Sequence, residues 1–212
     1  MATATMDPGT TAPPPGRFLA PILPRRRTLL VATALGSGAT IMFFAGMLGV
    51  YLSERADFLR DNPGGSWIPS SVTVELTAPS VIAWTLLLSV VTMQWAVYSA
   101  ARDDRPHTLI ATSVTALFGV AVINQFVFLY KQLGLEIDAG GVSTAPVLIY
   151  AVTGTFLLIL VVALTLLATM SFRALAGGDL RSHVDGMAAA SLYWYVMVFV
   201  YMIVWVAIFI TK

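Results

Sequence analysis

The side chains that could carry out chemistry are few in this sequence and lie outside its long apolar runs. There are two histidines, His107 and His183, and each lies beside charged residues of a short polar break. A metal site at membrane depth needs several histidine or carboxylate ligands, and the apolar runs do not supply them. The chain has no cysteine, so it cannot form disulfides, ligate iron–sulfur clusters or use a thiol nucleophile. The sequence therefore predicts neither a metal centre nor a catalytic site in this chain.

The apolar runs hold no Asp, Glu, Lys or Arg away from their ends. A proton or ion pathway needs such groups at depth, so a transporter or channel is disfavoured. No Walker loop, GxGxxG, HExxH or Ser/His/Asp set occurs. The polar groups that remain at depth are hydroxyls and amides, including the adjacent Asn124 and Gln125. Adjacent residues of a helix face different directions, and we expect one of the two to make an interhelical hydrogen bond. A contact with a ligand is the alternative.

The composition places these residues in a membrane. Only 11% of the 212 residues are charged, against about a quarter in soluble domains, and the mean hydropathy is +0.82. The formal net charge of +1 gives no reason to expect a nucleic-acid partner. We therefore expect an integral membrane protein.

Five apolar runs reach the length of about 20 residues that a membrane-spanning helix requires. They cover residues 28–52, 79–101, 106–130, 145–172 and 184–210, and they lack the alternation of barrel strands. The predicted fold is an all-α bundle of five transmembrane helices over residues 28–212. Residues 1–27 are Pro-rich and basic without the apolar core of a signal peptide, and we expect a flexible tail.

The distribution of lysine and arginine predicts the orientation in the membrane. With the N-terminus in the cytoplasm, that side carries eight basic residues and the opposite side four, which agrees with the positive-inside rule. The eight are Arg17, Arg25, Arg26, Arg27, Arg102, Arg105, Arg173 and Arg181, and the four are Arg55, Arg60, Lys131 and Lys212. We expect a cytoplasmic N-terminus and an external C-terminus.

Small residues gather on one side of the first apolar run. At 100° per residue, Ala34, Gly38, Ala45 and Gly49 fall within a sector of about 60°. Pairs of small residues four apart let helix backbones approach closely in lipid. This face should therefore meet protein or ordered lipid, and the sequence leaves open whether that protein is the same chain. After the run, "NPGGSWIP" (residues 62–69) predicts a folded cap rather than a free linker.

Several segments resemble the cytochrome c oxidase subunit III family. "TIMFFAGMLGVYLSERADF" resembles a family helix that reads "SSE-[LI]-MFF-[AG]-G-L-F-x-x-Y", and the shared positions are Met42, Phe43, Phe44, Ala45, Gly46 and Tyr51. Further matches follow in order along the chain: Trp67 and Pro69, then Gly119 and Gln125, then Tyr150, Thr153 and Gly154, and finally Tyr193 and Trp194. The pattern resembles the short bacterial form, which lacks the first two helices of the longer version.

The ionisable positions of the family are neutral here. Family glutamates correspond to Thr40 and Phe128, and family histidines correspond to Phe156, Ile159 and Tyr195. The family aspartate of the last helix falls on Val198. In the family these groups help to support lipid binding and polar surroundings near proton uptake by subunit I, and that role is not carried over to this chain.

The resemblance implies a non-catalytic subunit of a haem–copper terminal oxidase in a bacterial plasma membrane. Haem and copper would lie in partner subunits, subunit I would be the main partner, and structural phospholipids would bind. The alternatives are an accessory subunit of a nitric oxide reductase or other respiratory complex, and a small transporter. The expected residues for helix or lipid contact are Gly38, Met42, Phe43, Phe44, Ala45, Gly46 and Gly49, followed by Gln125, Thr153, Gly154, Tyr193 and Trp194.

Overall fold

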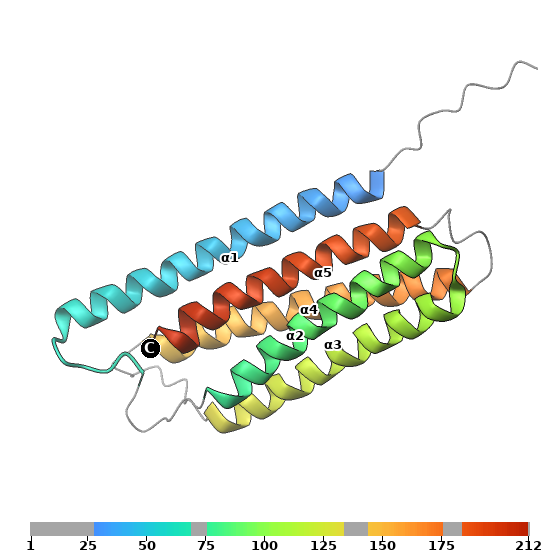
Figure 1. Cartoon of the computed structure of the whole chain (residues 1–212). Coiled ribbons are helices and arrows are strands. Elements are labelled where there is room, and N and C mark those ends of the chain that lie inside the picture. The colour runs from blue at the N-terminus through green and yellow to red at the C-terminus, as the bar shows by residue number, and fades with distance from the viewer. Residues whose placement is uncertain (1–27, 69–75, 134–143, 176–183, 212) are drawn as a thin grey trace, which may run out of the picture.

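The computed structural model describes residues 28–68, 76–133, 144–175 and 184–211, and most of these residues form long helices (Figure 1). The helices are α1 (Thr28–Asp61), α2 (Thr77–Ala101), α3 (Arg105–Leu133), α4 (Ala145–Leu175) and α5 (Val184–Val204), which continues as the π-helical segment η2 (Trp205–Ile210). All five are long and apolar enough to cross a membrane. The predicted all-α membrane bundle is confirmed. The N-terminal tail lies outside the described residues.

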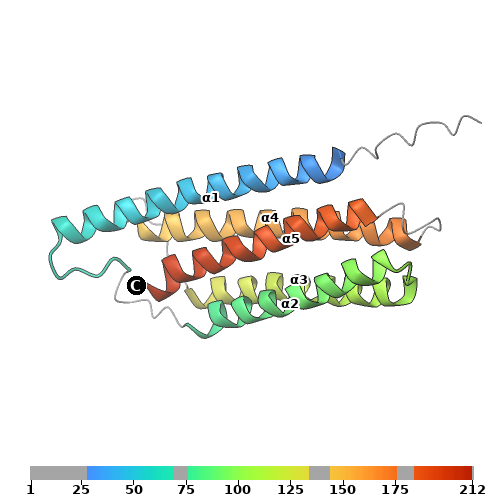
Figure 2. The same ribbon diagram turned by 45° about the horizontal axis from the view of Figure 1, so that its top comes forward.

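The helices lie roughly side by side in three layers (Figure 2). Helix α1 packs on α5 and along part of α4, which together form the middle layer. Helices α2 and α3 form the far layer, where α2 packs on α5 and α3 packs on α4. The two central helices are therefore covered from both sides, whereas α1 contacts the bundle from one side only.

Aromatic rings fill the region where α3, α4 and α5 meet. Phe126, Phe156 and Tyr201 come from these three helices in turn, and each is fully buried. Ring centroids lie 5.7 Å apart for Phe126 and Phe156, 6.0 Å for Phe126 and Tyr201, and 4.9 Å for Phe156 and Tyr201. Such spacing is favourable for aromatic pairs beyond the area that they bury. This cluster joins three of the five helices.

A glycine of α3 leaves room for side chains of the two central helices. A Cβ atom added at Gly119 would lie 2.6 Å from Leu164 Cδ2 and 3.0 Å from the Trp194 ring. Real Cβ atoms do not approach so closely, so even a small side chain here would require the Leu164 side chain to shift, and a large one would also press on the buried Trp194 ring. Close backbone approach through small residues is the usual way that helices associate in lipid.

Several polar side chains of the bundle are paired across helices. These hydrogen bonds join α2 to α5, α2 to α3, and α3 to α4, where little else competes for a buried donor. They are Trp194 Nε1 to Ser89 Oγ (2.9 Å), Tyr195 Oη to Gln94 Oε1 (2.6 Å), Tyr201 Oη to the Pro79 carbonyl (3.0 Å), Thr92 Oγ1 with Thr115 Oγ1 (2.8 Å), and Tyr130 Oη to Thr153 Oγ1 (2.9 Å). They link helices α2 to α5 into one unit.

The turn between α2 and α3 is tight and capped. Asp103 has a φ of 61°, a left-handed conformation that Asp tolerates better than most residues. The Asp104 carboxylate accepts hydrogen bonds from the His107 backbone N–H at 3.3 Å and from His107 Nδ1 at 2.8 Å. These bonds, the side-chain one first, lower the pKa of Asp104. Asp104 therefore caps the N-terminus of α3.

Beyond the membrane-spanning part, α1 continues past Leu52 to Asp61, and Arg60 Nη2 pairs with Asp57 Oδ1 at 2.8 Å. The following residues fold back onto the helix. The Trp67 ring is buried, with centroids 6.1 Å from Tyr51 and 5.4 Å from Phe58. The expected cap is present over the described residues 62–68, and Pro69 lies outside them.

Candidate functional site

Helix α1 meets the rest of the chain along a narrow line. Its buried residues are Ser37, Phe44, Leu48 and Tyr51. Three of them are seven apart, a spacing that keeps one line of a helix facing a neighbour. The sequence contained this signal, but sequence reasoning did not use it. A single narrow contact line leaves most of the helix circumference uncovered.

The uncovered side is the one that carries the small residues. We call Gly38, Met42, Ala45, Gly46 and Gly49 the open face of α1. Met42 is 79% exposed, and a Cβ atom added at any of the three glycines would meet nothing within 4 Å. Phe43 is also exposed, whereas Phe44 is buried against the bundle. The small-residue side therefore points away from the helices of this chain.

Apolar packing, rather than hydrogen bonding, holds α1 in place. In the part of the chain that the structure describes, the membrane-spanning residues of α1 make no side-chain hydrogen bond to another helix. Thr33 and Thr40 instead donate to carbonyls of their own helix, those of Leu29 and Gly36. Past the span, Thr144 Oγ1 donates to Glu54 Oε2 at 3.5 Å. The open face thus offers shape and close approach, and no group that could do chemistry.

The second group of expected residues lies mostly inside the bundle. Thr153 and Trp194 are fully buried and make the interhelical hydrogen bonds given above. Tyr193 is half-buried and packs against the core, and a Cβ atom at Gly154 would lie 3.9 Å from the Tyr130 hydroxyl. Gln125 is half-buried on the outer side of α3. The structure thus does not bring these residues together with the open face into one site.

Asn124 and Gln125 differ from the expectation of an interhelical hydrogen bond. Neither carboxamide bonds another described residue, and both line a recess on the surface of α3. Sequence pattern could not predict this, because a membrane helix is apolar both toward its neighbours and toward lipid. Periodicity then does not distinguish the inner side of the helix from the outer side.

The positions that are ionisable in the cytochrome c oxidase subunit III family lie in the apolar core or on the surface of this chain. Phe156, Ile159 and Val198 are buried in the apolar core. Tyr195 bonds Gln94, and Phe128 is 52% exposed on α3. Over the described ranges no three His, Cys, Asp or Glu side chains come together as a metal site would require.

These features define a class: a multi-pass helical membrane protein whose described residues build packing surfaces between long apolar helices. The family model for cytochrome c oxidase subunit III matches residues 25–212. The chain therefore belongs to the cytochrome c oxidase subunit III family.

Curated relatives agree with this assignment at low identity. Cytochrome c oxidase subunit 3 of Sus scrofa, of Tragelaphus imberbis and of Bos taurus are each 27% identical over 173 residues. The match covers 80% of this chain and 64% of each relative. The chain thus spans less than two thirds of the length of these relatives.

Proposed function

We propose that this chain is a non-catalytic subunit of a haem–copper terminal oxidase in a bacterial plasma membrane. Its helices pack against the catalytic subunit I and stabilise it, and haem and copper reside in partner subunits. Membership of the subunit III family is the observation that carries the proposal. The open face of α1 supports it, because a helix with exposed glycines and one narrow line of contact suits close packing by a second protein.

An accessory subunit of a nitric oxide reductase is the second candidate. It is favoured by the replacement of the ionisable family positions with apolar or neutral residues, of which Phe156 and Ile159 are now core residues. Such replacements remove polar surroundings that a proton-pumping partner would use, while leaving the packing framework in place.

Purification in mild detergent distinguishes the two. The full chain, tagged and expressed at native level, should bring down a partner with the absorption spectrum of haem a and with oxidase activity. Recovery of the chain alone would contradict both candidates, and recovery with b-type haem only would favour the second.

The contact surface is tested in the same preparation with Gly46→Leu. A leucine on the open face holds the partner backbone away, so the yield of co-purified haem should fall several-fold while the chain still inserts and folds. Ala168→Leu is the matched control, because Ala168 is also exposed but lies on α4. Equal haem recovery with both variants would show that the open face is not the contact surface.

A further inference from the structure

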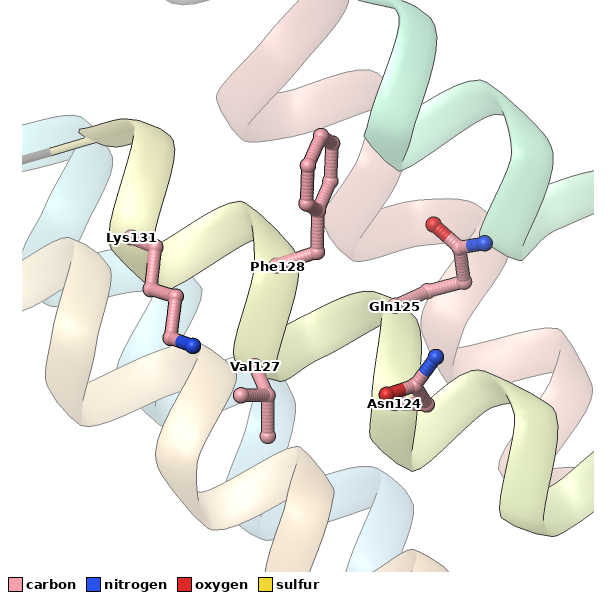
Figure 3. Close-up of a pocket in the computed structure, with 5 residues that line it drawn as sticks. All are labelled: Asn124, Gln125, Val127, Phe128 and Lys131. Atoms are coloured by element: carbon pink, nitrogen blue, oxygen red, sulfur yellow. The ribbon is translucent and has the colours of Figure 1, made fainter.

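The outer side of α3 carries a polar recess that the packing of the bundle does not use. It has a volume of about 310 Å³ and is lined by Asn124, Gln125, Val127, Phe128 and Lys131 (Figure 3). These five residues, called the α3 recess below, occupy the half of the helix that ends at Leu133. Asn124 and Lys131 are exposed, and Val127 and Phe128 are about half exposed at 47% and 52%.

The polar groups of the recess have no partner in the described part of the chain. Neither carboxamide makes a hydrogen bond there, and the Lys131 ammonium makes no ion pair. Polar groups that face hydrocarbon without partners cost several kcal/mol in model transfers. Within the described part of the chain these groups are therefore left open to a partner.

We propose that the α3 recess binds the headgroup of an acidic phospholipid. The Lys131 ammonium pairs with the phosphate, and the carboxamides of Asn124 and Gln125 donate to oxygens of the glycerol ester region. Exposed Val120 and Leu117 continue along α3 toward the membrane centre and receive an acyl chain. This inference goes beyond the proposed function, which concerns packing on subunit I.

The spacing of the groups along the membrane normal suits one lipid molecule. Asn124 and Lys131 are seven residues apart, so their Cα atoms are separated by about 10 Å along the helix. Lys131 lies in the last turn of α3, near the end of the span, so the carboxamides lie deeper. In Figure 3 Lys131 extends back toward Val127, and the two carboxamides lie at the other end of the recess. A phospholipid presents its phosphate and, further in, its ester oxygens in this order.

Other occupants fit less well. A second copy of the chain that paired through this side about an axis along the membrane normal would place Lys131 opposite Lys131, and the like charges would repel. A helix of a partner protein would need an anionic group opposite Lys131 and, deeper in the span, hydrogen-bond acceptors opposite both carboxamides, although polar side chains are costly at that depth. An acidic phospholipid brings both kinds of group without that cost.

The test uses the full chain in nanodiscs of phosphatidylcholine that contain one fifth phosphatidylglycerol. After detergent extraction, native mass spectrometry counts the phosphatidylglycerol molecules retained per chain. The native chain should retain phosphatidylglycerol in preference to phosphatidylcholine. Lys131→Met should reduce that preference about fivefold, the factor that corresponds to about 1 kcal/mol for one cation at an anionic surface. Lys131→Arg should restore it, and Asn124→Leu combined with Gln125→Leu should also weaken retention.

Arg173→Met is the matched control, since Arg173 is likewise an exposed cation in the last turn of a helix. It should leave retention unchanged. Equal retention by Lys131→Met and the native chain, or an equal loss with Arg173→Met, would overturn the proposal. So would a photo-crosslinker at position 124 that captures a partner protein instead of lipid in native membranes. Haem recovery, measured separately, reports on the oxidase proposal alone.

Discussion

At the scale of single residues, the two glycines Gly119 and Gly46 have opposite surroundings. Both lie in apolar runs, and both match positions of the subunit III pattern. Gly119 faces Leu164 and the Trp194 ring closely enough to exclude a Cβ atom, whereas space is open around Gly46. Substituting leucine at Gly119 therefore tests packing within the chain, whereas substituting leucine at Gly46 tests packing on a partner.

Gly119→Leu should destabilise the isolated chain by about 3 kcal/mol, because an over-packed interface must shift or strain. Gly46→Leu should change its stability by less than about 0.5 kcal/mol, as expected for a position without neighbours. The midpoint of unfolding in a titration with sodium dodecyl sulfate, followed by circular dichroism, measures both. If the two variants unfold at the same midpoint, the space that Gly119 leaves for Leu164 and Trp194 is not needed for the packing of α3 on α4 and α5.

At the scale of elements, the sequence predicted where the helices lie along the chain. It did not predict where each helix ends or which side of it faces the bundle. The hydropathy of the sequence predicts that the membrane-spanning part of α1 ends near Leu52. The helix nevertheless continues to Asp61, because Glu, Arg, Ala and Leu also favour a helix in water. It ends where Asn62, Pro63 and Gly64 follow, and Gly64 has a φ of 87°. The π-helical segment η2 has no comparable sequence signal.

The start of α3 shows an element end that local chemistry determines. Asp104 holds the first turn through the backbone and side chain of His107, and these bonds lower its pKa below the ordinary value of 3.8. A carboxyl whose pKa is lowered on folding stabilises the fold above its unfolded pKa. That contribution is lost as the pH falls through the lowered value. The first turn of α3 should therefore loosen in acid.

Hydrogen exchange of the backbone amides of His107 and Thr108, which donate to Asp104, measures this loosening. Protection, corrected for the intrinsic exchange rate, should fall as the pH drops below 3.8. Asp104→Asn should remove the pH dependence while keeping a cap, because Asn is also a good N-cap residue. Asp103→Asn is the control next to it, since Asn tolerates the left-handed conformation and Asp103 does not bond His107. A pH dependence that persists in Asp104→Asn would assign it to another group.

At the scale of the whole molecule, interhelical hydrogen bonds link the described helices α2 to α5, whereas α1 is held mainly by apolar contacts. Hydrogen bonds and an aromatic cluster link the four, whereas α1 adds apolar contacts through Phe44, Leu48 and Tyr51. The composition predicted such an apolar bundle, because charged groups are absent at depth. It could not predict which helix would be left open, since that depends on the contacts between helices far apart in sequence.

The orientation of the bundle remains a prediction from basic residues, and the α2–α3 turn offers a direct test. The chain has no cysteine, so a single Asp103→Cys variant gives a unique and exposed label site. With the N-terminus in the cytoplasm, an even number of helices precedes this turn, which places it inside the cell. A membrane-impermeant maleimide should therefore label it only after the cells are permeabilised. A cysteine at Asn62, beyond the end of α1 and equally exposed, is the matched control and should label in intact cells. The reverse pattern would invert the bundle and would place the α3 recess in the cytoplasmic leaflet.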